Sequence, residues 1–390
     1  MTGDPLFQNG VDLAVILIVL VKVFITFAAL LVGVLLMIWF ERRVIADMQS
    51  RIGPNRAGPW GLLQPLADGI KVFFKEDLLP EKADRRVYRL APYLSTIPAF
   101  AAFSVIPIGG SISIAGHRTL LQLADPPIGV LFLLAMSSIA VYGIMLAGWS
   151  SGSKYPLLGS VRASAQMVSY EAAMSLAVAG AVLAAGSLST HDIVVSQAPW
   201  RWNLWQLGVV PFVIYLIAAT AEVNRPPFDL VEAEQELVGG FFTEYAGVRF
   251  ALFYLAEFMN TITVSAVAVT LFLGGPNGPR VPVIGAVSPV WFFVKLIAFL
   301  FVYVWLRATL PRFRYDQLMD LGWKRLIPLA LYWLLLVAAL QIGRQEGWNV
   351  GAVLAVAIGA GAVGWAALGA ALRQSPHAAH ELERSAGARI

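Results

Sequence analysis

The sequence has 390 residues, of which 58% are hydrophobic and only 13% are charged. Soluble domains usually carry about 25% charged residues. The composition therefore excludes a protein built from soluble domains and indicates an integral membrane protein.

The sequence contains no Cys and only four His. Without Cys there can be no disulfide, no iron–sulfur cluster held by thiolates and no Cys nucleophile. His117 and His191 fall in separate predicted loops, and His377 and His380 fall in the C-terminal tail. No His pair is therefore placed to hold a haem or a metal, and any redox group must belong to another subunit.

Nine apolar stretches approach the roughly 20 residues that a helix needs to cross a bilayer. They cover residues 13–40, 90–108, 127–149, 163–188, 205–222, 248–273, 290–307, 326–342 and 350–372. The first could reach about 42 Å, longer than a hydrocarbon core of about 30 Å, so we expect it to be tilted. It is also too long, and its leading segment too poor in basic residues, for a cleaved signal peptide.

The fold class that follows is an all-α polytopic membrane protein. We expect a single transmembrane domain over residues 1–372, with about nine transmembrane helices, and a polar, poorly ordered cytoplasmic tail over residues 373–390. Orientation follows from the basic residues: 19 Lys and Arg lie in the segments after spans one, three, five and seven, against four on the other side. The positive-inside rule then places the N-terminus outside and most charged segments in the cytoplasm.

The segment after the first span, Glu41 to Arg89, carries ten basic and seven acidic residues. Within it, apolar residues recur at helical spacing on one side: Leu62, Leu66, Ile70, Phe73 and Phe74. This pattern is typical of an interfacial amphipathic helix on the cytoplasmic side. It could serve as a plain membrane anchor, or it could frame an opening for an amphiphilic ligand.

Charged residues that fall within or at the ends of predicted spans include Glu171, Glu222, Glu257 and Lys295. A charge at the bilayer centre is costly, so such residues usually face a bundle interior or water. Taken singly, each can be a locally paired group near a helix end. Three carboxylates on three successive spans instead favour a proton path, because burial lets carboxyl groups exist in both protonation states.

The predicted loop after the fifth span is acidic where topology expects it to be basic. It holds one Arg225 against six acidic residues: Glu222, Asp229, Glu232, Glu234, Glu236 and Glu244. Either this is a solvated acidic face, or mutual repulsion makes it a proton reservoir. Neighbouring apolar residues such as Phe228 argue against simple solvation, and the run Arg225-Pro226-Pro227 breaks regular helix.

Four segments together closely resemble one family. They are ERRVIADMQSRIGPNRAGPWGLLQPLADGIKVFFKED, SYE around Glu171, AEVNRPPFDLVEAEQELVGGFFTEY with the following AEFMN, and WLRATLPRFRYDQLMDLGWK. The family is the quinone-site membrane subunit of respiratory complex I, which bacterial type-I NADH dehydrogenase and mitochondrial NADH:ubiquinone oxidoreductase share. The resemblance runs from about residue 13 to 342.

The resemblance implies a subunit of a proton-translocating NADH:quinone oxidoreductase, in a bacterial plasma (inner) membrane, without activity as an isolated chain. The family forms the membrane side of the quinone chamber. It lies between the cluster-bearing subunits of the hydrophilic arm and the antiporter-like subunits, with small membrane subunits nearby. FMN and iron–sulfur clusters reside in partner subunits, the substrate is ubiquinone or menaquinone, and no cofactor, metal or nucleic acid is expected on this chain.

The resemblance also assigns site residues. Along the quinone channel it places Glu41, Arg42, Arg51, Asp68, Lys71 and Arg225. To the acidic path for protons and coupling it assigns Glu171, Glu222, Asp229, Glu232, Glu234, Glu236 and Glu257. For Arg312, Arg314 and Asp316 of the PRFRYDQL motif it suggests a structural or subunit-facing role, and no function is assigned to Arg249.

Two other classes compete with this interpretation. The equivalent subunit of a membrane-bound hydrogenase, formate hydrogenlyase or cofactor-F420 dehydrogenase shares parts of the acidic loop but not the complete set of motifs. A stand-alone secondary transporter would have a midplane site with broken helices, often in repeated halves. Here the polar residues cluster on the cytoplasmic side, and no repeat is visible.

Overall fold

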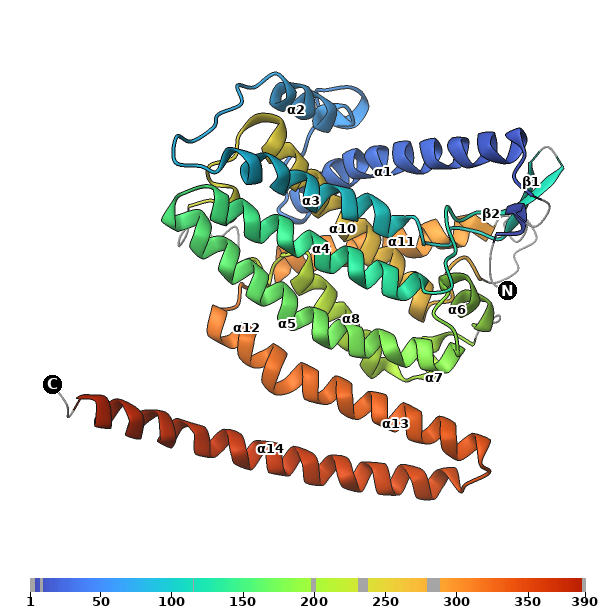
Figure 1. Cartoon of the computed structure of the whole chain (residues 1–390), viewed down its shortest axis with the longest axis vertical. Coiled ribbons are helices and arrows are strands. Elements are labelled where there is room, and N and C mark those ends of the chain that lie inside the picture. Colours follow the sequence, from blue (N-terminus) through green and yellow to red (C-terminus); the bar gives the residue numbers. More distant parts are fainter. Residues whose placement is uncertain are drawn as a thin grey trace. The chain divides into compact units, whose positions relative to one another are not determined.

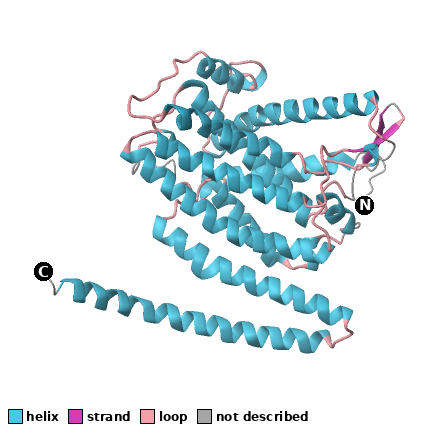
Figure 2. Ribbon diagram, viewed as in Figure 1, coloured by secondary structure: helices cyan, strands magenta, loops and turns pink. Residues whose placement is uncertain are grey.

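The computed structural model describes residues 4–7, 10–114, 116–197, 201–230, 238–278 and 288–387. Most of those residues are helical, and there is one short pair of strands (Figures 1 and 2). The all-α polytopic fold is therefore confirmed. Two compact units are formed, residues 1–330 and residues 331–390, and every candidate site residue discussed below belongs to the first.

Helix α1 (Leu13–Met48) is the longest helix of the first unit, after a short 3-10 turn η1 (Pro5–Phe7). Its 36 residues correspond to about 54 Å at 1.5 Å per residue. The helix continues for a further two turns beyond the predicted span, through the charged residues Glu41, Arg42 and Arg43. A helix this long exceeds the hydrocarbon thickness even more than the sequence suggested.

The amphipathic segment forms helix α2 (Gln64–Phe73), preceded by the 3-10 turn η2 (Pro59–Gly61). Its apolar residues Leu66, Ile70 and Phe73 are exposed, as expected for a helix that lies on a membrane surface. Helix α3 (Arg85–Phe103) follows, and the side chain of Asp84 caps its N-terminus by accepting from the Arg86 and Val87 amides.

Strands β1 (Ser111–Ile114) and β2 (His117–Leu120) form an antiparallel pair, with Ser111 opposite Leu120. The pair joins α3 to α4 (Gly129–Ser150), and α5 (Lys154–Ala185) runs back beside α4 (Figure 1). Two short helices, α6 (Thr190–Ser196) and α7 (Asn203–Gln206), precede α8 (Val209–Glu222).

The remaining helices follow the acidic segment. They are the 3-10 turn η3 (Gly240–Phe242), α10 (Gly247–Phe272), α11 (Ser288–Thr309), α12 (Tyr315–Leu321), a π-helical turn η4 (Gly322–Leu326), α13 (Ile327–Gln345) and α14 (Val350–Gly387). Helix α14 runs through residues 373–387, and the weak order predicted for that tail stays a prediction.

Each of the nine predicted spans corresponds to a helix. Seven helical stretches among the described residues are long and apolar enough to cross a membrane. Helix α8 is shorter, with 14 residues, because Gly208 adopts φ 82° and separates it from α7. Helix α3 begins with three arginines, Arg85, Arg86 and Arg89, which lower its hydropathy. The count of nine therefore stays a prediction for these two helices.

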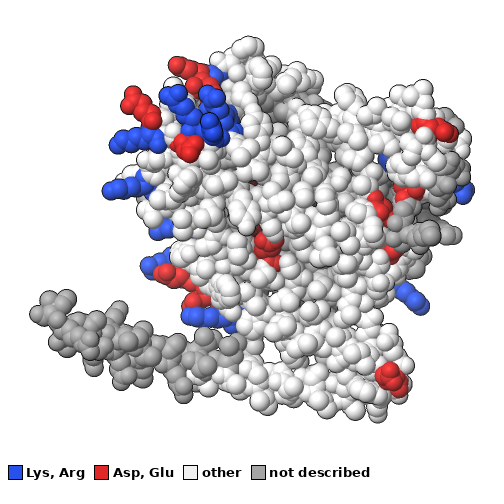
Figure 3. Space-filling model, viewed as in Figure 1, with Lys and Arg blue, Asp and Glu red and all other residues white. Residues whose placement is uncertain are grey.

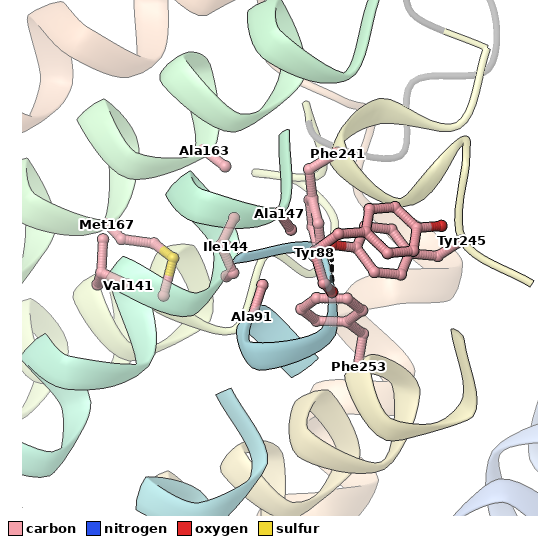
Figure 4. Packing of buried hydrophobic residues seen from close by; sticks show 10 residues of the cluster. All are labelled: Tyr88, Ala91, Val141, Ile144, Ala147, Ala163, Met167, Phe241, Tyr245 and Phe253. Atoms are coloured by element: carbon pink, nitrogen blue, oxygen red, sulfur yellow. Dashed lines mark hydrogen bonds between the residues drawn. The ribbon is translucent and has the colours of Figure 1, made fainter. Parts of the chain in front are cut away.

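A cluster of buried aromatic and aliphatic residues joins α3, α4, α5, η3 and α10 (Figure 4). At its centre the rings of Tyr88 and Tyr245 stack with centroids 4.0 Å apart, and the Tyr245 hydroxyl donates to the Tyr88 carbonyl at 3.1 Å. The remaining members are Ala91, Val141, Ile144, Ala147, Ala163, Met167, Phe241 and Phe253. This aromatic cluster fixes η3 against the helices around it.

Charged side chains are unevenly distributed on the surface (Figure 3). On the face shown, Lys and Arg gather at the edge where the loop before α3 lies, while the broad middle carries few charges. This is the distribution that a bilayer-spanning protein needs, with a basic rim on one side of an apolar band.

Candidate functional site

Four charged side chains, of which Glu41 and Arg225 are buried and the other two partly exposed, form a cluster in the first unit, here called the central charge cluster: Glu41, Arg225, Glu257 and Arg307. Arg307, in the last turn of α11, donates to Glu41 Oε1 near the end of α1. Arg225 Nη1 lies 3.7 Å from the same oxygen, and Arg225 Nε lies 2.9 Å from Glu257 Oε1 on α10. Two carboxylates and two guanidinium groups thus meet with balanced charge.

Arg225 contacts both carboxylates of the central charge cluster. Its side chain is 7% exposed, and its guanidinium carbon lies 4.5 Å from the ring centre of Phe258, one residue after Glu257. Burying a charge is costly unless it is paired. The ion pairs of this cluster therefore join four elements, which are α1, α10, α11 and the loop after α8. Loss of one charged group would leave another without its partner.

Two further carboxylates are bound by neighbouring serines of α4. Ser137 donates to Glu222 Oε1, at the end of α8, and Ser138 donates to Glu171 Oε1 on α5. Glu222 and Glu257 also line one cavity of about 40 Å³. The structure thus brings Glu222 close to both other span carboxylates that the sequence singled out.

The beginning of the acidic loop is buried. Asp229 is 6% exposed, and its Oδ2 lies 3.2 Å from Arg312 Nη2. Gln166 Nε2 donates to the Phe228 carbonyl at 2.9 Å, and the Phe313 amide donates to the Pro227 carbonyl at 3.0 Å. A solvated acidic face is therefore wrong for residues 228–230. Glu232, Glu234 and Glu236 lie outside the described residues.

The remaining predicted quinone-channel residues lie nearer the surface. Arg42 Nη1 is 2.6 Å from Asp68 Oδ2, which joins α1 to α2. Burial raises the pKa of Asp68, but the hydrogen bond and charge of Arg42, with smaller contributions from Gln64 and Lys71, bring it below its ordinary value. Arg51 and Lys71 are exposed, and neither forms an ion pair with any acidic side chain in the described part of the chain.

An apolar cavity of about 900 Å³ runs beside α1. Residues of α1 from Leu17 to Phe40 line one side, and α10, α11 and the strand region line the other. It extends as far as Trp39 and Phe40, and the next residue is Glu41 of the central charge cluster. Trp39 Nε1 also donates to the Trp60 carbonyl at 3.0 Å, which ties this end of α1 to the loop before α2.

Sequence reasoning missed several residues of the candidate site. Arg307 was not singled out, although an isolated cation at the end of the apolar run 290–307 is the same signal that identified Lys295. Ser137 and Ser138 carry no charge, so only their pairing within an apolar span could have marked them. Arg312 was expected to be structural or subunit-facing, and the structure pairs it with Asp229.

Other charges have local structural partners. Lys295 Nζ donates to three backbone carbonyls near the end of α10, at 2.5 to 2.9 Å, as expected for a locally bonded lysine. Arg249 Nη2 lies 2.8 Å from Asp77 Oδ2 and joins α10 to the first long loop. Over the residues described, no three His, Asp or Glu side chains are placed to hold a metal ion.

Comparisons with known proteins find similar sequences over most of the chain. Residues 21–338 match the family model described as NADH dehydrogenase. The chain is 52% identical to the H subunit of the NADH-quinone oxidoreductase of Frankia alni over 352 residues, covering 87% of this chain and 78% of that protein. It is 53% identical to the protein of the same name in Frankia casuarinae, with the same coverage, and 52% identical over 355 residues to that of Streptomyces avermitilis, with 88% and 77% covered.

Proposed function

The chain belongs to the NADH dehydrogenase family of membrane subunits, and from this premise we propose that it forms the membrane side of a quinone chamber and couples quinone reduction to proton translocation. It is a multi-pass bacterial membrane protein and a subunit of an NADH-quinone oxidoreductase. Quinone is then the substrate, and FMN and iron–sulfur clusters belong to partner subunits.

One observation carries the quinone part of the proposal: a 900 Å³ apolar cavity ends beside buried charges. A quinone is an amphiphile, with a long apolar tail and a polar head. The cavity along α1 suits the tail, and Glu41, Arg307 and Arg42 beyond Phe40 offer hydrogen-bond donors and acceptors to the head. Ligand sites of this kind combine an apolar lining with a few placed polar groups.

The proton part of the proposal follows the carboxylates. Reduction and protonation of quinone change the charge near Glu41, and Arg225 connects Glu41 to Glu257. Glu257 shares a cavity with Glu222. A charge change in the chamber therefore has a short, continuous route to Glu222, Ser137 and the neighbouring Glu171, from which we propose that protons or an electrostatic shift reach the antiporter-like subunits.

The test is a comparison of two electron acceptors in the purified complex. Arg42→Ala and Asp229→Asn are expected to lower NADH oxidation by a soluble quinone, at equal assembly, while reduction of a hydrophilic artificial acceptor stays unchanged. Arg43→Ala is the matched control, because Arg43 is adjacent to Arg42 and its ion pair is with the exposed Asp47. Quinone-linked turnover at the wild-type level in both variants would remove Arg42 from the chamber and Asp229 from the coupling path.

A further inference from the structure

Two cavities meet at Glu222 in the interior of the first unit. The inner cavity is lined by Glu257, Phe241 and Phe253, on the side expected to face the cytoplasm. The outer cavity, also about 40 Å³, is lined by residues toward the opposite side, among them Ile106 and Leu271. Glu222 and Asn260 line both, so the carboxylate is placed where the two cavities adjoin.

Together the cavities follow α10 across most of a bilayer. Their lining begins at Phe253 and ends at Leu271 on that helix. At 1.5 Å per residue this stretch is about 27 Å long, close to the hydrocarbon thickness of about 30 Å. Glu222 therefore has one cavity toward each side of the membrane.

Two residues that line the outer cavity each hold a buried polar atom without a partner in the described part of the chain. Glu222 Oε1 accepts from Ser137, but Glu222 Oε2 has no hydrogen bond to any described residue. Thr263 is 4% exposed, and its Oγ1 likewise has none within the described ranges. Buried polar groups are normally satisfied by protein or by ordered water. The cavity volume is well above the roughly 10 to 15 Å³ that one water needs.

We propose that ordered water in the outer cavity joins Glu222 to Thr263 and begins a route by which a proton leaves Glu222 toward the outer face within this chain. In this step the O–H bond of the Glu222 carboxylic acid breaks and the proton passes to the water. The electron pair stays on the carboxylate, where the Ser137 hydroxyl continues to donate. The inference extends the proposed coupling role, and rests on it.

The rest of the outer cavity is suited to act as a gate. Beyond Thr263 its lining is mainly apolar and includes Val178, Val267 and Leu271. Hydrophobic constrictions gate conduction by dewetting. A dry apolar stretch there interrupts the water between Glu222 and the outer face, so an idle protein does not leak protons.

The inner cavity supplies the other half of the route. Ile144, Met167, Phe241 and Phe253 line this cavity and also belong to the aromatic cluster (Figure 4). Its wall is therefore well packed and holds its shape. Glu257, in the same wall, is paired with Arg225, so a proton or a charge change in the central charge cluster reaches Glu222 from the inner side.

The first test uses the whole complex in sealed proteoliposomes, with proton uptake per NADH and turnover as readouts. Thr263→Val keeps the shape but removes the hydroxyl, and is expected to slow proton-coupled turnover roughly tenfold, whereas Thr263→Ser restores it. Thr261→Val is the matched control, because Thr261 is a buried threonine of α10 that donates to the Glu257 carbonyl and lines neither cavity.

The Glu222→Gln variant distinguishes the proposed outer proton route from the proposed coupling role. If this variant is impaired and Thr263→Val behaves as wild type, the outer route is overturned while the coupling role stands. If Glu222→Gln itself pumps normally, both are overturned.

A second variant tests for a gain of function, measured as passive proton leak, which does not require turnover of the complex. Val267→Thr places a hydroxyl in the apolar part of the outer cavity with little change in volume. We expect it to raise passive proton leak through resting proteoliposomes several-fold, and Glu222→Gln in the same chain to abolish that leak. A leak equal to wild type would contradict the dewetted gate.

Discussion

Arg225 and Glu257 form a buried ion pair between the loop after α8 and helix α10, with Arg225 Nε 2.9 Å from Glu257 Oε1. The same guanidinium lies 3.7 Å from Glu41 and over the ring of Phe258. Because Arg225 is 7% exposed and Glu257 is 18% exposed, water solvates each side chain only partly if the other is removed. Loss of the pair is therefore expected to lower the stability of the subunit as well as its quinone-linked activity.

Replacement of Arg225 by Gln is expected to destabilise the subunit by at most about 3 to 5 kcal/mol, the cost of leaving a fully buried charge without its partner, because Glu257 is partly exposed. The measurement is the unfolding temperature of the purified complex, with quinone-linked turnover alongside. Arg43→Gln is the control, because the exposed Arg43–Asp47 pair is expected to contribute less than about 1 kcal/mol. Equal effects of both variants would contradict the buried pair.

The helices were largely predictable because a bilayer imposes a simple rule of length and hydropathy. The rule fails where a conformational break or charge interrupts an apolar run. Gly208 shortens α8, and the arginines at the start of α3 lower the mean hydropathy of that helix below that of a typical membrane span. It also misses helix that continues past an apolar run, such as the last two turns of α1 beyond Phe40.

The candidate site was predictable only where charge stands out against an apolar background. Glu222 and Glu257 were found in this way, and the structure places them on one cavity. Which cation each carboxylate meets depends on contacts between residues far apart in sequence, such as Glu41 with Arg307. Uncharged donors such as Ser137 carry no comparable signal. The roles of all these residues stay predictions until variants are measured.

The Ser137 hydroxyl is predicted to act through Glu222. Ser137→Ala removes the donor to Glu222 Oε1, and is expected to lower quinone-linked proton pumping roughly tenfold, as for loss of a hydrogen bond to a charged group. In a Glu222→Gln background the same change should have no further effect, because interacting residues are not additive. The double-mutant cycle is measured as pumping rate. A tenfold loss in both backgrounds would show that Ser137 acts elsewhere.

The Arg42–Asp68 pair gives a pH prediction. The pKa of Asp68 is below its ordinary value of 3.8, so its ionised form stabilises the fold above that pH and the contribution is lost only as pH falls through the lowered pKa. Asp68→Asn should therefore raise the quinone KM by the same factor at every pH from about 6 to 8. The measurement is the ratio of variant to wild-type KM. A ratio that falls toward 1 as pH is lowered in this range would show that Asp68 titrates there.

Two glycines of α5 give a matched stability test. A Cβ at Gly159 would lie 2.8 Å from the Gly240 Cα of η3, whereas a Cβ at Gly180 would meet nothing within 4 Å. Gly180→Ala is expected to stabilise by up to about 1 kcal/mol through helix propensity. Gly159→Ala must displace η3, whose Phe241 lines the inner cavity, and is expected to destabilise by about 1 to 3 kcal/mol. The unfolding temperature of the complex measures both, and a Gly159→Ala variant as stable as Gly180→Ala would contradict the close approach of α5 to η3.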